Sequence, residues 1–267
     1  MTNVYTHGHH ESVLRSHRWR TAENSAGYLL PLLTSGMRLL DVGCGPGTIT
    51  MDLADLVGPA GRVTALERTE EALSLARDEA RRRHTGNVEF AVGNVQGLDI
   101  ADESYDVVHA HQVLQHVDDP VRALHEMRRV CRPGGVVAVR ESDYAGFTWF
   151  PQLPELDRWL DVYRRVARSN DAEPDAGRRL LSWARTAGFT DVTAGSSTWC
   201  YATAEDRTWW GGLWADRMTQ SDLGRQAVDR DLATAEDLSA IAAGWRRWAE
   251  ADDGWFSVLH GEVIARA

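Results

Sequence analysis

Three glycines stand at alternating positions directly behind an apolar stretch that ends in an acid. The stretch reads RLLDVGCGPGTIT over residues 38–50 and contains Asp41, Gly43, Gly45 and Gly47. Glycine adopts positive φ without strain and lets a ligand approach the backbone, although its freedom costs entropy on folding. In open α/β sheets, ligands bind at the carboxyl ends of the strands. We therefore expect a ligand at this loop.

Two classes of cofactor bind such a loop: dinucleotides and S-adenosylmethionine. The dinucleotide fingerprint is GxGxxG, whereas residues 43–48 read GCGPGT, with Thr48 at the position of the third glycine. Pro46 has no backbone N–H to donate to a pyrophosphate. Asp41 would repel a phosphate but suits a cationic partner. These features disfavour a nicotinamide-dependent oxidoreductase.

The segment LLDVGCGPG closely resembles motif I, DxGxGxG, of the class I S-adenosylmethionine-dependent methyltransferases. The resemblance covers about residues 37–141, including RPGG at 132–135, which matches the turn before the fifth strand. YDVVHAHQVLQHVDDP and EMRRVCRPGGVVAV resemble the subgroup that acts in ubiquinone and menaquinone biosynthesis. The resemblance implies direct methyl transfer from S-adenosyl-L-methionine to a small molecule, with O, C or N as acceptor.

The resemblance also implies a role for each matched loop position. The three glycines, with Cys44 between them, would let the backbone pass close to the methionine part of the cofactor. Asp41 would face the amino group of the cofactor, directly or through water. The loop residues expected to bind the cofactor are therefore Asp41, Gly43, Cys44, Gly45 and Gly47. The alternatives are that Asp41 is a turn former and that Cys44 is a buried apolar filler.

Further cofactor contacts are expected after the second and third strands. Glu67 lies about twenty residues past the loop, where a carboxylate can accept both ribose hydroxyls. Arg68 would cover the adenine face or be a surface charge. The family often has an acid after the third strand, whereas this chain has Asn94, whose amide oxygen can still accept from the adenine amine. Val95 would donate its N–H to the ring.

Histidines follow the fourth expected strand in HAHQVLQHVDD. We expect His109 to lie in the core and His111 to sit at the tip of the strand, where the sulfonium and the acceptor should meet. His116 is expected beside the cofactor. The Asn/Asp-Pro-Pro-aromatic motif of enzymes that methylate adenine or glutamine nitrogen is absent here, which argues against such acceptors.

A base is needed only if the acceptor must lose a proton, as a phenol, an enol or a carbon acid would. The fifth strand ends in RESDYAGF, which carries Glu141, Asp143 and Tyr144. His111 and His116 follow the neighbouring strand. The candidate catalytic residues are His111, His116, Asp143 and Tyr144, and the sequence ranks none above the others.

Alternating strands and helices must position these residues. Apolar runs predict strands at 37–43, 61–67, 87–93, 104–111, 132–141, 192–201 and 255–267. Amphipathic patterns predict helices at 48–57, 69–83 and 118–131, with Thr69 as an N-cap and Pro120 near a helix start. The fold class is α/β: a Rossmann-like, doubly wound, mostly parallel seven-stranded sheet with an inserted helical cap.

We expect one methyltransferase domain over residues 1–267. Residues 1–36 would form lid helices, 37–141 the cofactor-binding core, and 142–174 and 203–253 cap insertions. Ten of the eleven tryptophans follow residue 148, so they either anchor the cap or line an acceptor pocket beside His111 and Tyr144. The rings considered for that pocket are Trp149, Trp209, Trp210 and Trp214.

Composition limits the partners. The formal net charge is −10, and every one of the 29 Lys and Arg residues is arginine. An acidic surface disfavours a nucleic-acid partner, and the lack of lysine excludes a lysine Schiff base or a P-loop. The three cysteines are scattered, and the spacing of His7, His9, His10 and His17 does not suit a metal, so none is expected.

Without a signal peptide or an apolar run of about 18 residues, we expect a cytoplasmic protein without membrane insertion. The expected partner is a small-molecule substrate, and a monomer and a homodimer both remain open. The alternative to a methyltransferase is a non-catalytic or regulatory protein that retains the S-adenosylmethionine-binding fold. Such a protein would keep the glycine loop and Glu67 but have a blocked acceptor pocket.

Overall fold

The computed structural model describes residues 11–267, and their side chains from residue 14 onward. Residues 1–10 of the predicted lid, with His7, His9 and His10, lie outside this range. The chain divides into two compact units. The first contains the described residues up to Ser16, Ser142–Asp175 and Ser197–Leu259, and the second contains His17–Glu141, Ala176–Ser196 and His260–Ala267.

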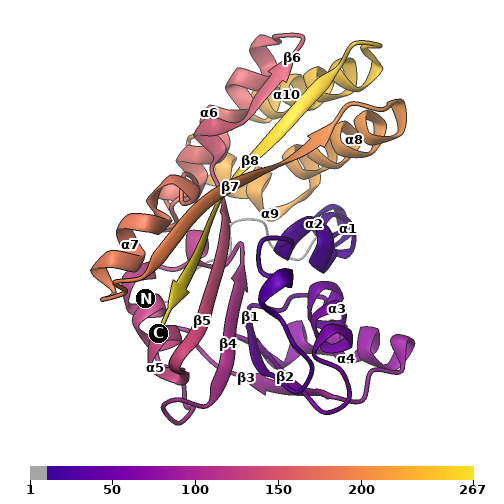
Figure 1. Cartoon of the computed structure of the whole chain (residues 1–267). Coiled ribbons are helices and arrows are strands. Elements are labelled where there is room, and N and C mark those ends of the chain that lie inside the picture. Colours follow the sequence, from indigo (N-terminus) through magenta and orange to yellow (C-terminus); the bar gives the residue numbers. More distant parts are fainter. Residues whose placement is uncertain (1–10) are drawn as a thin grey trace. The chain divides into compact units, whose positions relative to one another are not determined.

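The second unit is built on a parallel sheet (Figure 1). Its strands are β1 (Arg38–Val42), β2 (Arg62–Glu67), β3 (Val88–Val92), β4 (Tyr105–His111) and β5 (Cys131–Ser142). They lie in the order β3-β2-β1-β4-β5, each pair parallel, and β8 (Trp255–Arg266) follows β5. The strand order reverses at β1, and ligands of such sheets bind at the carboxyl ends of the strands at this reversal.

Helices cover both faces of this sheet. One face packs against α2 (Ala22–Ala26), η1 (Leu30–Leu32) and α3 (Thr48–Val57), with α4 (Glu70–Arg83) beside β2 and β3. The other face packs against α5 (Pro120–Val130) and α7 (Leu180–Thr186), which follows the short turn η4 (Gly177–Arg179). Val107 faces the α3 side and Val108 the α5 side, because side chains alternate along a strand.

The sequence signals for helix ends are confirmed in this unit. The hydroxyl of Thr69 accepts a hydrogen bond from the N–H of Ala72 at 3.2 Å and so caps α4. Two acids follow in the first turn and three arginines occupy the last, as the helix dipole favours. Asp119 caps α5 by accepting from the N–H of Arg122, and Pro120 takes the first helical position.

The first unit is mainly helical and aromatic. Its elements are α6 (Pro154–Arg168), α8 (Ala204–Gln220), α9 (Asp222–Asp229), α10 (Ala235–Glu250), the turn η3 (Tyr144–Gly146), the short strand β6 (Thr148–Phe150) and the first residues of α1 (Glu11–Arg18). Strands β7 (Val192–Tyr201) and β8 contribute residues to both units. Trp159, Trp214 and Trp245 are almost fully buried and pack within 4.6–6.1 Å of one another around α6, α8 and α10.

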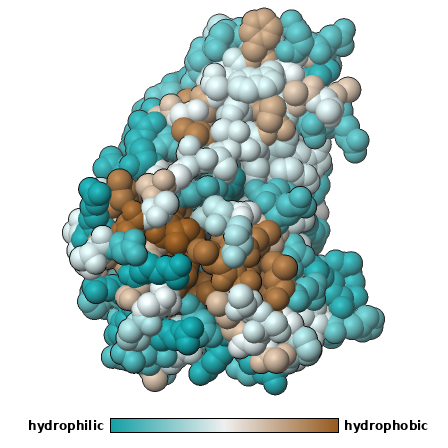
Figure 2. Space-filling model, viewed as in Figure 1, coloured by the Kyte–Doolittle hydropathy of each residue, from teal (hydrophilic) through white to brown (hydrophobic). Residues whose placement is uncertain are grey.

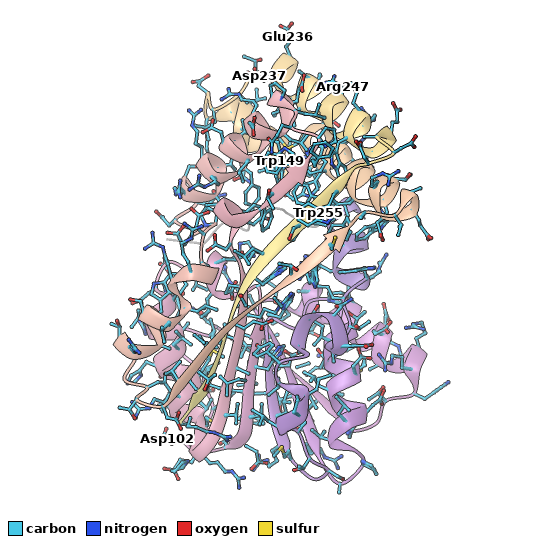
Figure 3. The ribbon with its side chains drawn as sticks, turned by 45° about the horizontal axis from the view of Figure 1, so that its top comes forward. Asp102, Trp149, Glu236, Asp237, Arg247 and Trp255 are labelled. Atoms are coloured by element: carbon cyan, nitrogen blue, oxygen red, sulfur yellow. The ribbon has the colours of Figure 1, made fainter. Side chains whose placement is uncertain are left out.

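Phe256 lies at the centre of this aromatic core. Its ring centroid is 5.3–6.1 Å from those of five tryptophans: Trp149, Trp159, Trp210, Trp245 and Trp248. Successive side chains of a strand point to opposite faces of the sheet. On β8, Phe256 is therefore buried while its neighbour Trp255 is 40% exposed, and Trp149, which lies opposite Phe256 on β6, is 6% exposed (Figure 3). Most of these tryptophans therefore anchor the helices of the unit.

The predicted fold class is confirmed, with one correction to the strand count. The sheet has eight strands among residues 11–267, where the sequence predicts seven. The additional strand is β6, which pairs antiparallel with β8 through Trp149 opposite Phe256. Three residues are too few to give a recognisable alternation, so the sequence could not indicate it.

The face of the molecule seen in Figure 2 is largely polar. Hydrophilic side chains cover most of the face in view in Figure 2, while apolar ones gather in one area near its centre. Within the described part of the chain, every helix is too short or too polar to cross a lipid bilayer.

Gly47 permits a test of how the helices pack on the sheet. Its φ is +82°, and a Cβ there would lie 3.0 Å from the Cα of Ala76 on α4. Gly36 has a φ of +92°, but a Cβ there meets no described atom within 4 Å. We expect Gly47→Ala to lower the free energy of unfolding by about 1–3 kcal/mol more than Gly36→Ala, because only Gly47 adds overlap to strain. Denaturant unfolding measures both, and equal losses would contradict the α3–α4 contact.

Candidate active site

The glycine loop leaves the end of β1 and leads into α3. Gly43, Gly45 and Gly47 all have positive φ, at +68°, +53° and +82°. A Cβ on Gly43 would lie 2.5 Å from the side chain of Val113, and one on Gly47 would meet Ala76, so packing excludes side chains at both positions. A Cβ on Gly45 meets no atom of the described residues within 4 Å. The loop is thus closed on two sides and open at Gly45, where a ligand can approach the backbone.

Glu67, at the end of β2, binds this loop. One carboxylate oxygen accepts from the N–H of Gly45 at 2.9 Å, and the other accepts from the N–H of Arg68 at 3.0 Å. Glu67 is partly exposed, and the side chain of Arg68 is exposed. The carboxylate therefore stands beside the open glycine, and its contact with the ribose stays a prediction.

The other predicted contacts differ in exposure. Asn94 is exposed, and its side-chain oxygen accepts from the N–H of Gln96 at 3.1 Å, which leaves a second lone pair for a ligand. Val95 is buried beside it. The side chain of Cys44 is also buried, and burial raises the pKa of its thiol well above the ordinary value, with Asp41 adding to the rise. Cys44 thus contributes backbone and packing rather than a thiolate.

Asp41 is buried and holds two partners from neighbouring elements. One oxygen lies 2.7 Å from Nδ1 of His109 on β4, and the other accepts from the hydroxyl of Thr50 on α3 at 2.5 Å. His109 is fully buried, as the sequence predicts. A carboxylate at Nδ1 fixes the proton there. Nε2 of His109 is buried and meets no hydrogen-bond partner among residues 11–267. Contact of Asp41 with an amino group of the cofactor stays a prediction.

The two other histidines of the β4 tip are neutral at pH 7. Burial lowers the pKa of His111 well below its usual value, and the nearby Arg20 and Arg140 lower it further. Burial also lowers the pKa of His116 to about 3, with Arg20 again contributing. Nε2 of His116 lies 3.1 Å from the side-chain nitrogen of Gln115. Both rings are therefore uncharged imidazoles.

Glu141 holds the turn that follows His111 and carries His116. Its carboxylate accepts from three successive backbone N–H groups of the turn η2 (Leu114–His116) and its N-cap: Val113 at 2.9 Å, Leu114 at 2.7 Å and Gln115 at 3.3 Å. Burial is the largest influence and raises the pKa of Glu141 to about 8, although the three N–H groups favour the charged form. The carboxyl is fully occupied by the backbone that it orients.

A second layer of polar residues surrounds the tip, and the sequence analysis did not find most of it. Arg140 is 1% exposed, and its Nε donates to Glu262 of β8 at 3.0 Å. The hydroxyl of Tyr28 is buried and has no hydrogen-bond partner in the described part of the chain. Burial raises the pKa of Tyr28 well above its ordinary value, while Arg140 opposes that rise. The sequence signal for the Arg140–Glu262 pair was that each of two apolar strands contains a charged residue, and that the two charges are opposite.

The remaining two predicted catalytic residues belong to the first unit, whereas His111 and His116 belong to the second. Asp143 is 1% exposed, and its N–H donates to the carbonyl of Leu259 at 3.0 Å. The ring of Tyr144 stacks on that of Tyr163 with centroids 3.9 Å apart, inside the aromatic core. The four predicted catalytic residues therefore form two pairs, one in each unit.

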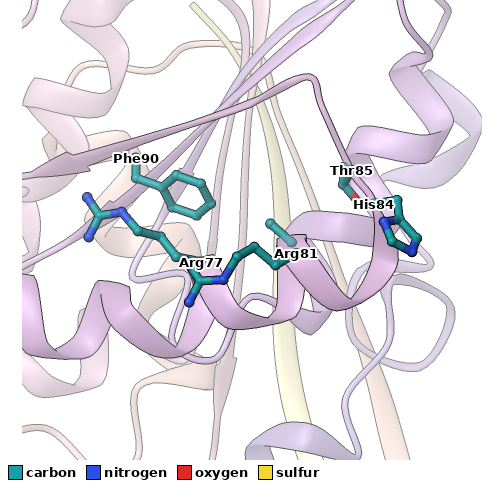
Figure 4. Close-up of a pocket in the computed structure, with 6 residues that line it drawn as sticks. Arg77, Arg81, His84, Thr85 and Phe90 are labelled. Atoms are coloured by element: carbon teal, nitrogen blue, oxygen red, sulfur yellow. The ribbon is translucent and has the colours of Figure 1, made fainter.

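A shallow cavity of about 420 Å³ lies elsewhere, on α4 and β3 (Figure 4). Arg77 places its guanidinium 5.3 Å from the ring centroid of Phe90 there. The other lining residues are Ala80, Arg81, His84 and Thr85, so no predicted site residue contributes. In the part of the chain that the structure describes, no group of three or more His, Cys, Asp or Glu side chains is arranged to hold a metal ion.

Comparison with known proteins shows the family. Residues 33–206 match the family model described as a methyltransferase domain. An uncharacterized methyltransferase of Schizosaccharomyces pombe is 35% identical over 97% of this chain and 95% of that protein. The demethylmenaquinone methyltransferase of Lactococcus lactis is 32% identical over 59% of this chain and 68% of that protein. This chain belongs to the class I S-adenosylmethionine-dependent methyltransferases.

A solved structure shares the fold. The phosphoethanolamine N-methyltransferase 2 of Haemonchus contortus, in complex with S-adenosylhomocysteine, has a TM-score of 0.55 and 18% identity, and the match covers 88% of this chain and 49% of that one. The chain is an enzyme, and its cofactor is S-adenosylmethionine. The residues of the second unit fit this cofactor, because Gly45 leaves the loop open, Glu67 stands beside it, and the imidazoles at the β4 tip carry no charge to repel a sulfonium.

Gly45 tests the position of the cofactor. We expect Gly45→Ala to weaken binding of S-adenosylhomocysteine by about tenfold or more, or about 1.4 kcal/mol, because its Cβ enters the open side of the loop. Gly36→Ala is the matched control, since it also adds a Cβ at positive φ in open space. Calorimetric titration of the two folded variants measures the affinity. Equal affinities would show that nothing binds at Gly45.

The raised pKa of Glu141 makes the free energy of unfolding depend on pH. The unfolded carboxyl ionises near pH 4.5 and the folded one near pH 8. Between these values the folded chain binds the proton more tightly, so the free energy of unfolding falls as pH rises. Since Gln does not titrate, we expect wild type to lose up to about 1.4 kcal/mol per pH unit relative to Glu141→Gln between pH 5 and 8. Denaturant unfolding at several pH values measures this slope. Parallel curves for the two proteins would rule out the raised pKa.

Proposed function

We propose that this enzyme transfers the methyl group of S-adenosylmethionine directly to a small apolar or aromatic metabolite, at oxygen, carbon or nitrogen. The observation that carries the proposal is the tip of β4, where burial keeps the imidazoles of His111 and His116 neutral beside the turn that Glu141 holds. A buried site with a few uncharged polar groups suits a small apolar ligand. The demethylmenaquinone methyltransferase relative acts, by its name, on a compound of this kind.

When bound, S-adenosylmethionine supplies a methyl group on a positively charged sulfonium. The thioether that leaves is neutral, so no side chain has to stabilise an anion. The work of the chain is to align the acceptor, and alignment alone accounts for a large part of such rate enhancements. The loop at Gly45 and the carboxylate of Glu67 would hold the donor, and the turn fixed by Glu141 holds His116 beside the end of β4, where His111 lies.

The pKa values restrict the acceptor. A general base works best when its pKa is near the working pH. His116, with a pKa of about 3, accepts protons poorly at neutral pH, and the pKa of His111 is lowered in the same direction. Glu141 is occupied by three backbone N–H groups. We therefore propose an acceptor that is already anionic at neutral pH or carries a free lone pair, with the imidazoles as neutral contacts.

Charge supports a small-molecule partner over a nucleic acid. The net charge is −10 and lysine is absent from the sequence. Proteins that bind nucleic acids through the phosphate backbone usually present clustered basic side chains. Several arginines of the second unit are instead paired with acids of their own chain, such as Arg83 with Asp52 and Arg129 with Glu126.

A panel of acceptors tests this function. We expect transfer of the labelled methyl group from S-adenosylmethionine to an aromatic amine or to an acidic phenol that is ionised at neutral pH, and none to RNA, DNA or protein. Matched pairs that differ only in the presence of the nucleophilic group identify the methylated atom, with mass spectrometry as the readout. Methylation of RNA or protein would contradict the proposal. Cofactor binding without turnover of any small acceptor would favour the regulatory alternative.

A further inference from the structure

Three side chains of the second unit form a hydrogen-bonded chain that reaches from the N-terminal segment to β8. Nη2 of Arg20 donates to Oε1 of Gln112 at 2.6 Å. Nε2 of Gln112 lies 2.9 Å from Nε2 of His260. Gln112 directly follows β4, and His260 lies on β8, 148 positions further along the chain and fully buried. Such a chain is sensitive to the hydrogen-bonding capacity of each member.

The donor properties of Arg20 decide the protonation of His260. A guanidinium only donates, so the Gln112 atom that faces it must be the amide oxygen. The other end of Gln112 is then the NH₂ group, which donates to His260. Nε2 of His260 must therefore carry a lone pair, and the proton of the neutral ring sits on Nδ1. A protonated His260 would present an N–H to the NH₂ group and lose this bond.

His260 in turn contacts the predicted methyl-transfer site. Its ring is stacked on that of His111, with centroids 6.2 Å apart and planes inclined by 29°. The charged and titratable groups around the pair are Arg20 before α2, His109 on β4, Arg140 on β5 and Glu262 on β8 itself. Arg140 is bound to Glu262, while Arg20 is directed at the amide of Gln112.

Backbone strain indicates that Gln112 is placed for this contact. Its φ is +55°, in the left-handed region that residues other than glycine seldom adopt. Its N–H donates to the carbonyl of Arg140 at 2.8 Å, which fixes the residue against β5. Strain of this kind persists where the surrounding structure imposes it, often at functional sites.

We propose that His260 is a positioning residue of the methyl-transfer site. The Arg20–Gln112 pair holds its ring neutral, with the proton on Nδ1, and the ring stacks on the imidazole of His111. This role rests on the proposed function, which places the sulfonium near the tip of β4. A neutral ring at this position avoids the repulsion that an imidazolium would exert on a cationic cofactor.

The first experiment examines the wild-type protein. Histidine labelled with ¹⁵N reports the tautomer of each ring by NMR, and His260→Gln assigns the signal. We expect His260 to stay neutral with an unprotonated Nε2 from pH 6 to 8. A proton on Nε2, or a charged ring at pH 7, would overturn the proposal without reference to any variant.

The second experiment changes the middle of the chain. Gln112→Glu replaces the NH₂ donor with a carboxylate, which favours a charged His260 by accepting its N–H. Affinities are measured for S-adenosylmethionine, which carries the sulfonium, and for S-adenosylhomocysteine, which does not. We expect the affinity for S-adenosylmethionine, divided by that for S-adenosylhomocysteine, to depend on the charge of His260. This ratio should be about fivefold lower at pH values where NMR shows His260 charged than at those where it is neutral.

Controls separate this effect from others. Wild type, measured over the same pH range, removes the contribution of Glu141. Gln226→Glu makes the same change in the first unit, where Gln226 contacts Asn170, and should leave the ratio unchanged. A ratio in Gln112→Glu that follows wild type at every pH, or a His260 that never becomes charged, would overturn the proposal. Neither binding measurement uses an acceptor, so failure of the acceptor panel alone would count only against the proposed function.

Discussion

Near-complete burial of three acidic side chains, Asp41, Glu141 and Glu262, is the constraint on which the rest of this site depends. A buried carboxylate must gain hydrogen bonds or give up its charge. Asp41 gains them from His109 and Thr50, Glu262 from Arg140, and Glu141 from three backbone N–H groups. Each of these bonds joins two elements, so the same interactions that satisfy the acids also set the distances between the glycine loop, the β4 tip and β8.

Such a network suits chemistry at a cationic centre. The donor of this enzyme class is positively charged, and the groups at the β4 tip are neutral imidazoles rather than lysine or imidazolium. Arg140, which is buried nearby, has its charge balanced by Glu262. The resulting tip is polar, and its imidazoles add no positive charge. A preorganised environment of this kind costs no rearrangement when the reaction occurs.

The local parts of this arrangement could be read from the sequence. These parts depend on neighbouring residues and all are present in the structure: the glycine loop, the strand ends near Asp41 and Glu67, the cap at Thr69, Pro120 at a helix start, and the helix over residues 48–57. The cap segments over the site remain predictions.

The sequence could not show the partners that come from far along the chain. His260 reads as an ordinary histidine in an apolar strand, and only the order β4-β5-β8 brings it to His111. Arg20 lies in a segment without a motif. The partners of Asp41 were equally hidden, because its register opposite His109 follows from strand pairing.

The position of β8 has a consequence for how the protein matures. His260 and Glu262 meet partners 148 and 122 residues earlier in the chain. During synthesis, the glycine loop and its flanking strands leave the ribosome long before β8 exists. Contacts of such long sequence separation form late and slow folding. Until β8 is in place, Arg140 lacks Glu262 and Gln112 lacks His260. The polar network at the β4 tip is therefore complete only after β8 has been synthesised and has joined the sheet.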